Sequence, residues 1–81
     1  MNLYVVYDKI AKESGAVHEN KNDAVALRNY EIFISEQKNI KRDEFAIYRV
    51  GTFDHVTMAI TAEEPIEVKP RLELVDQLEE D

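Results

Sequence analysis

Apolar and polar positions follow one long helical pattern in the chain, over residues 21–37. Side chains three and four positions apart share one face of an α-helix, and apolar residues recur here at that spacing. The stripe that they form comprises Ala26, Leu27, Tyr30, Phe33 and Ile34. Asn22 comes just before it and is a favourable N-cap, because its side-chain oxygen can accept from a free backbone N–H of the first turn. The pattern predicts a helix over residues 21–37 whose apolar stripe faces the core.

The segments on either side of this helix have the composition of strands, with many β-branched and aromatic residues. Residues 2–8 are apolar on both faces, which is typical either of a central strand or of a strand in a sheet that is covered on both faces. Residues 44–50 and 55–61 flank the turn-forming residues 51–54, and this arrangement predicts a β-hairpin. The residues between the first strand and the helix indicate a loop that ends in a short extended segment. We therefore expect an α+β fold, in which a small antiparallel β-sheet of three to four strands has one long helix packed on one face.

A single helix covers only one face of such a sheet, so the opposite face needs a second cover. Either the C-terminal segment or a second copy of the chain would supply it. On the helix, Val25 and Ile32 lie away from the core stripe, beside Arg28. They are either scattered surface residues, which are normal, or a small docking patch. We assign Val25, Ile32, Tyr4 and Val6 to the interface of a homodimer.

Charge divides the chain into two parts. Residues 1–62 carry eight basic and nine acidic side chains, whereas residues 63–81 carry two basic and eight acidic ones, so their formal charges are −1 and −6. Two prolines favour extended backbone in the acidic part, while Leu72, Val75 and Leu78 recur there at helical spacing. We expect a compact domain over residues 1–62 and an acidic C-terminal tail over residues 63–81, which is either extended, docked or a short helix.

Residues for catalysis or metal binding are sparse. The chain has no cysteine, and its two histidines, His18 and His55, lack the spacing of metal ligands. It contains no glycine-rich phosphate loop and no nucleophile motif. We therefore expect a protein that is not an enzyme, with no metal and no cofactor. No apolar run is long enough to span a membrane, and the first residues do not have the pattern of a signal peptide.

Basic residues concentrate just after the helix, and they either favour the negative end of its dipole or contact phosphates. Aromatic side chains of the sheet are either buried in the core or exposed beside these cations, where they would stack bases of a single strand. The acidic tail would then compete with nucleic acid for the basic surface. The candidate nucleic-acid-binding residues are Arg28, Lys38, Lys41, Arg42, Arg49 and Tyr48.

Three blocks of sequence carry a resemblance to a known family. The first is Leu3-Tyr4 with Tyr7-Asp8-Lys9, the second is KNDAVALR at residues 21–28, and the third is YRVGTFD at residues 48–54. In this order and spacing, they resemble the small nonstructural protein of gokushoviruses, the single-stranded DNA phages of the microvirus family. The resemblance covers residues 1–62.

The resemblance implies a nonstructural phage protein in the cytoplasm of an infected bacterial host. It implies a non-catalytic accessory role in viral single-stranded DNA replication, by binding single-stranded DNA, the viral replication initiator or a host protein. The alternative is a protein-interaction module that uses its acidic tail and its helix surface and has no direct contact with DNA. The family has no catalytic residues to place on this chain.

Overall fold

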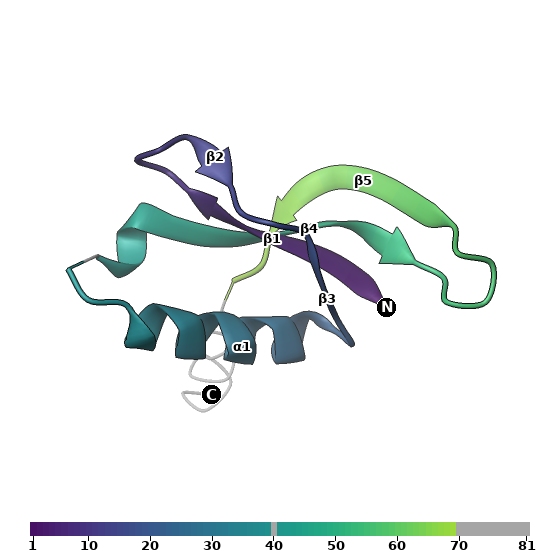
Figure 1. Ribbon diagram of the computed structural model, residues 1–81, viewed down its shortest axis with the longest axis horizontal. Helices are drawn as coiled ribbons and strands as arrows, with labels where there is room; N and C mark the ends of the chain where they lie inside the picture. Colours follow the sequence, from purple (N-terminus) through teal and green to yellow (C-terminus); the bar gives the residue numbers. More distant parts are fainter. Residues whose placement is uncertain (40, 70–81) are drawn as a thin grey trace, which may run out of the picture.

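One antiparallel sheet and one helix make up the part of the chain that the computed structural model describes, residues 1–39 and 41–69 (Figure 1). The order of the strands is β2-β1-β4-β5, and β3 also pairs with β1. The elements are β1 (Asn2–Asp8), β2 (Glu13–Ser14), β3 (His18–Asn20), α1 (Asp23–Glu36), the 3₁₀ turn η1 (Arg42–Glu44), β4 (Phe45–Phe53) and β5 (Ile60–Glu67). The α+β class and the antiparallel sheet are confirmed, and the sheet has five strands because β2 and β3 add two short ones.

The centre of the sheet is the long antiparallel pair of β1 and β4, which runs from Asn2 opposite Thr52 to Asp8 opposite Phe45. Backbone hydrogen bonds extend this pairing past both ends, from Lys9 N to Glu44 O and from Phe53 N to Met1 O. On its other edge, β1 pairs with β2 near its end and with β3 near its start. The apolar run of residues 2–8 is therefore a central strand, as its sequence predicts.

The helix α1 lies along one side of the sheet (Figure 1). Its start is predicted correctly, since the Asn22 side chain accepts a hydrogen bond from Val25 N at 2.9 Å. Six buried residues make up the core cluster: Tyr4, Ala26, Tyr30, Ile34, Ile47 and Val68. Of the predicted stripe, Leu27 is only partly buried, and Phe33 keeps 40% of its surface exposed and meets Phe45 edge-on at the rim.

The predicted hairpin exists, but its turn is displaced by several residues. β4 continues through Gly51 to Phe53, and β5 begins only at Ile60, so the expected turn at residues 51–54 and the expected strand at residues 55–61 are wrong. Gly51 is buried within the ladder, where a Cβ atom would lie 2.3 Å from the carbonyl oxygen of Thr61. This glycine serves the close approach of two strands and not a turn.

The predicted boundary after Ala62 falls inside β5, which continues the sheet to Glu67. Val68 follows it and is buried in the core cluster on the side of α1. The acidic segment thus begins as part of the sheet. The helical spacing of Leu72, Val75 and Leu78 lies outside the described residues.

Candidate binding surfaces

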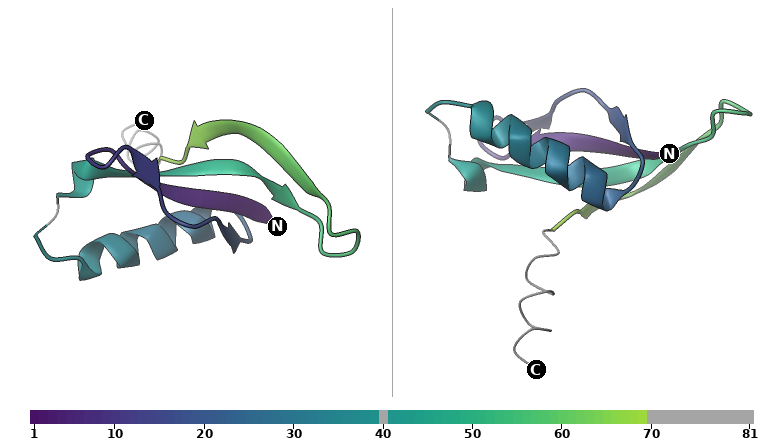
Figure 2. Two further views of the ribbon diagram at one scale, coloured as in Figure 1. Left: turned by 45° about the horizontal axis from the view of Figure 1, so that its top comes forward. Right: turned by 90° about the horizontal axis from the view of Figure 1, so that it is seen from below.

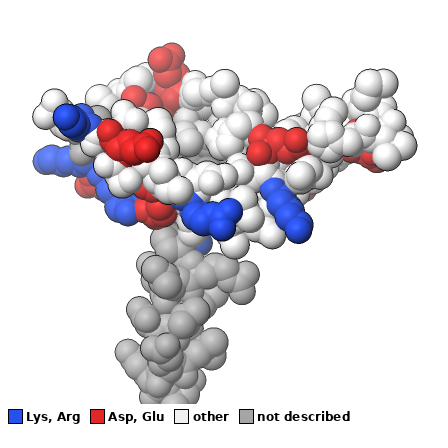
Figure 3. Space-filling model, turned by 60° about the horizontal axis from the view of Figure 1, so that its bottom comes forward, with Lys and Arg blue, Asp and Glu red and all other residues white. Residues whose placement is uncertain are grey.

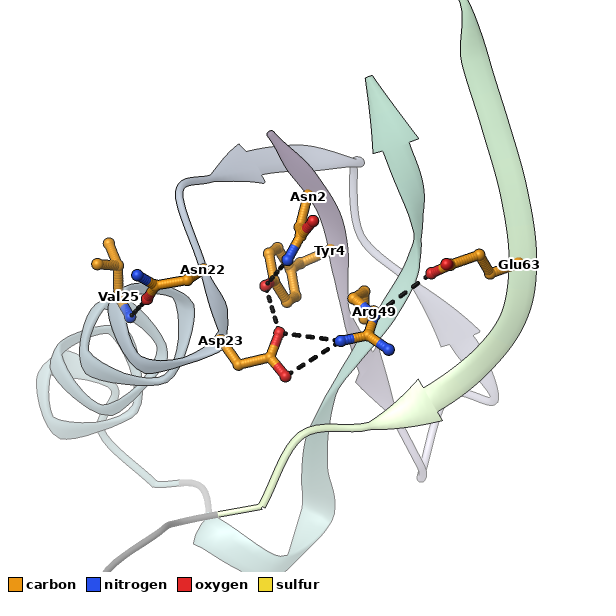
Figure 4. A network of polar contacts seen from close by, with 7 residues as sticks. All are labelled: Asn2, Tyr4, Asn22, Asp23, Val25, Arg49 and Glu63. Carbon is orange, nitrogen blue, oxygen red and sulfur yellow. Dashed lines mark hydrogen bonds and ion pairs between the residues drawn. The ribbon is translucent and has the colours of Figure 1, made fainter. Parts of the chain in front are cut away.

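A polar network joins the start of α1 to the sheet (Figure 4). The hydroxyl of Tyr4 donates to Asp23 Oδ1 at 2.5 Å and accepts from Asn2 Nδ2 at 3.0 Å. Arg49 reaches the same Asp23 carboxylate at 3.2 Å and Glu63 on β5 at 3.3 Å. Asp23, in the first turn of α1, therefore accepts a hydrogen bond from Tyr4 on β1 and forms an ion pair with Arg49 on β4.

This network changes the interpretation of two predicted site residues. Tyr4 has no exposed surface, so it cannot contact a second copy or stack on a base, and its assignment to a dimer interface is wrong. Val6 lies on the same side of β1 and packs against the core cluster. Arg49 is held between two carboxylates, which leaves its guanidinium little freedom to bind phosphate. Its partner Asp23 lies 26 positions away in the sequence.

The sheet face away from α1, which we call the open face, is hollowed and apolar. A hollow of about 500 Å³ lies on it, and its lining contains no charged residue: Val5, Tyr7, Ser14, Val17, Tyr48, Val50 and Pro65. The rings of Tyr7 and Tyr48 meet edge-on with their centres 6.2 Å apart. Tyr48, a predicted nucleic-acid contact, thus lies in an uncharged hollow. The hollow is open among the described residues, and the expectation of a second cover over this face stays a prediction.

The side of the molecule formed by α1 carries charged side chains of both signs (Figure 3). Figure 3 turns the side of α1 toward the viewer and shows Lys and Arg side chains spread across it, with Asp and Glu among them. Arg28, Lys38 and Lys41 are exposed and take part in none of the ion pairs among the described residues. Arg42 is paired with Glu31.

The exposed side of α1 also carries an apolar residue close to Arg28. Ile32 is one helical turn from Arg28 and is 51% exposed, whereas Val25 is half-buried. We call Arg28, Ile32, Lys38 and Lys41 the helix surface. Four of the predicted nucleic-acid residues, Arg28, Lys38, Lys41 and Arg42, therefore lie on α1 or just after it. Tyr48 is on the opposite face of the sheet, so the six predicted residues do not form one surface.

A third exposed feature was not predicted. The end of the β4–β5 hairpin, residues 54–60, extends beyond the rest of the sheet (Figures 1 and 2), and we call it the hairpin arm. It exposes Val56, Met58 and Ile60 at 90%, 74% and 67% of their surfaces. The alternation of these residues in the sequence is that of a strand with one apolar face, and it therefore predicts a strand at a position where the structure has the exposed end of a hairpin. The sequence signal for the turn is Asp54, whose side chain caps the backbone N–H groups of Val56 and Thr57.

Residues 1–39 and 41–69 meet neither the requirements of a metal-ligating cluster nor those of a membrane-spanning helix. These residues contain no group of three His, Asp or Glu side chains that would hold a metal ion. The helix that the structure describes is too short and too polar to cross a membrane.

Comparison with protein families decides the identity of the chain. The family model described as "Phage ORF5 protein" matches residues 1–74. The chain belongs to this family. The resemblance to a phage protein is thereby confirmed at the level of the Phage ORF5 family. Neither the search of curated proteins nor the search of solved structures finds a match.

The Phage ORF5 match also extends the resemblance along the chain. It continues through residues 63–74, which the sequence blocks left unassigned. β5 runs to Glu67 and Val68 is in the core, so the first acidic residues after Ala62 lie both in the sheet and in the region that the family model matches.

Proposed function

We propose that this Phage ORF5 protein is a non-catalytic accessory factor of phage single-stranded DNA replication, related to the small nonstructural protein of gokushoviruses. It acts in the cytoplasm of the infected bacterium by binding the viral replication initiator through the helix surface. Two observations carry the proposal: the exposed Ile32 lies one helical turn from Arg28 on α1, and Arg28, Lys38 and Lys41 are exposed and take part in no ion pair among the described residues.

Such a surface suits a protein with apolar and acidic residues. Aromatic or aliphatic anchors supply most of the affinity at protein interfaces, and the charges around them set the orientation and the association rate. Ile32 is the anchor here, and Arg28, Lys38 and Lys41 are the surrounding charges. Phe33, at the rim of the core, enlarges the apolar area on the exposed part of α1.

Direct contact with DNA is the second candidate function, and the same three cations favour it. The arrangement of the other predicted residues supports it less. Arg49 and Arg42 are paired with carboxylates, and Tyr48 lies on the opposite face. Residues 1–62 also carry a formal charge of −1, which gives no long-range attraction to phosphates.

A salt titration with a single-stranded oligonucleotide separates the two candidates. Three phosphate contacts would give a slope of log K against log salt of about −2, because each contact contributes about −0.7 on a single strand. The protein-contact proposal expects no binding at about 50 mM salt, where such contacts are still strong. Binding with that slope, abolished by Lys38→Glu with Lys41→Glu, would contradict it and favour the DNA candidate. The matched control is the pair Lys9→Glu and Lys12→Glu, which reverses as many charges in the loop after β1.

A further inference from the structure

The turn at the end of the hairpin arm is held by many hydrogen bonds. The Asp54 side chain accepts from Val56 N at 2.8 Å and from Thr57 N at 3.2 Å. The Asp54 backbone donates to Ala59 O at 3.0 Å and accepts from Met58 N at 2.7 Å. The two backbone N–H groups hold the pKa of the Asp54 carboxyl below its usual value. The apolar tip is therefore fixed in shape, and fixing it in a complex would cost little conformational entropy.

The base of the arm is also tied to the body of the protein. His55 Nε2 lies 2.6 Å from Glu19 Oε2 on β3, the short strand that pairs with β1. The ring of Phe53 packs edge-on against the ring of His55, with their centres 4.8 Å apart. The arm thus points in a defined direction away from the sheet, as the views in Figure 2 show.

Met58 is an unusual residue for its place in the turn. Its φ of 65° is in the left-handed region, which costs a residue other than glycine about 1–3 kcal/mol. Its side chain is 74% exposed, so burial within the chain does not compensate for the strain. Glycine or asparagine would satisfy the backbone better. A contact outside the chain would explain a long, flexible apolar side chain at this position.

The charge of the hairpin restricts what it binds. Residues 50–67 contain four carboxylates, Asp54, Glu63, Glu64 and Glu67, and no lysine or arginine. A polyanion such as DNA or an anionic membrane surface would be repelled. The binding site for the tip must therefore be apolar and free of negative charge.

The hollow of the open face has these properties. Its lining is uncharged, and its volume of about 500 Å³ is within the roughly 300–1,000 Å³ typical of ligand pockets. Its concave shape, with Val17 and Pro65 among the lining residues around β1 and β4, suits a protruding element better than a second flat sheet face. Because neither the lining of the hollow nor the apolar tip carries a charge, burying the tip there would not desolvate an unpaired charge.

We propose that the hairpin arm of one copy docks its tip, Val56, Met58 and Ile60, into the hollow of the open face of a second copy. A reciprocal exchange fills both hollows and closes the assembly as a two-fold dimer, whereas a one-way contact would continue into a chain. The C-terminal segment is less suited as the occupant, because Val68, from which it continues, is buried on the side of α1, opposite the hollow. The helix surface of the proposed function takes no part in this contact, so each proposal can fail without the other.

Sedimentation of the full-length protein tests the exchange. We expect a dimer for the wild type and a monomer for Met58→Glu on the tip and for Val17→Glu in the hollow. Both residues are exposed, at 74% and 58%, so neither change disturbs the core, and circular dichroism checks that both variants fold. The matched control Ile10→Glu, at a position 72% exposed and outside both surfaces, should leave the dimer intact. A monomeric wild type, or a Met58→Glu variant that stays dimeric, would overturn the proposal.

Disulfide trapping tests the geometry of the contact directly, because the chain has no native cysteine. Met58→Cys and Val17→Cys are made in two separately tagged proteins and mixed under mild oxidation. We expect the mixed disulfide between the two proteins to form faster than either symmetric one. Symmetric disulfides alone would overturn the exchange. The oligomeric state of a variant that lacks residues 70–81 gives a further check. If the full-length protein is a monomer and this variant is a dimer, the exchange is overturned for the full-length protein and the hollow is assigned to the C-terminal segment.

Discussion

Replacing Tyr4 with alanine is expected to lower the free energy of unfolding by about 3–5 kcal/mol, the usual range for removing a buried aromatic side chain. Tyr4 is fully buried, and its cluster joins β1 to α1, to Ile47 on β4 and to Val68 after β5. A domain of this size has few other large buried side chains, and its total stability is about 5–15 kcal/mol at most. In urea denaturation at neutral pH, the midpoint for Tyr4→Ala should be much lower than for the wild type, or the variant should be unfolded without urea.

The Tyr4→Phe variant separates the ring from the hydroxyl. It keeps the packing and loses the hydrogen bond to Asp23, for which we expect a loss of about 0.5–1.5 kcal/mol. A Tyr4→Ala variant as stable as Tyr4→Phe would contradict the central place of the ring in the core.

The same pair of variants predicts a change in alkaline stability. Burial, and then the hydrogen bond to Asp23, raises the pKa of Tyr4 from about 10 to about 12. Because the folded state holds this proton more tightly than the unfolded chain, the contribution is complete below about pH 10 and is lost as the pH rises toward 12. Melting temperatures from about pH 8 to about pH 11 should fall less steeply for Tyr4→Phe than for the wild type. A smaller decline remains in the variant, since burial also raises the pKa of Tyr30.

Replacing Gly51 with alanine is expected to destabilise the protein by about 1–3 kcal/mol, as overpacking of a tight contact does. The new Cβ would lie 2.3 Å from the Thr61 carbonyl oxygen and 3.3 Å from the Ala62 Cα. Both are backbone atoms of β5, so the strand itself must shift. The midpoint of urea denaturation measures the loss.

Gly15→Ala is the matched control for that change. The nearest atom to its new Cβ is the Val6 carbonyl oxygen at 4.0 Å, and Gly15 does not have a positive φ. We expect a neutral effect or a gain of about 0.4–1 kcal/mol through the unfolded state. Equal losses at both glycines would show that β5 does not approach β4 as closely as described.

Local signals in the sequence predicted the elements whose structure depends on near neighbours. The Asn22 side chain accepts a hydrogen bond from an N–H only three residues away. The two apolar faces of residues 2–8 correspond to a central strand with one face in the core and the other lining the apolar hollow. The prediction of a turn at residues 51–54 is wrong because glycine occurs both in turns and where two strands approach closely, and the sequence alone does not distinguish the two cases. The alternation of Val56, Met58 and Ile60 likewise fits either a strand or an exposed tip.

The rest of the candidate site depends on contacts between residues that are far apart in the sequence, and these contacts cannot be predicted from a single sequence. Alternation along β1 predicts two faces but not that α1 covers the one with Tyr4 and leaves Val5 and Tyr7 open. Arg49 looked available for phosphate because its partners, Asp23 and Glu63, are distant in the sequence. Arg28, Lys38 and Lys41 stayed exposed because α1 and the residues after it place them on the outside.

Binding of the viral replication initiator through the helix surface is most directly tested by precipitation of the tagged protein from cells infected with the phage, after nuclease treatment to remove DNA bridges. The initiator should be recovered with the wild type and with the controls Ile10→Glu and Lys12→Glu, and lost with Ile32→Glu and Lys41→Glu. Absence of the initiator from the wild-type precipitate, or its equal recovery with the helix-surface variants, would contradict the proposed function.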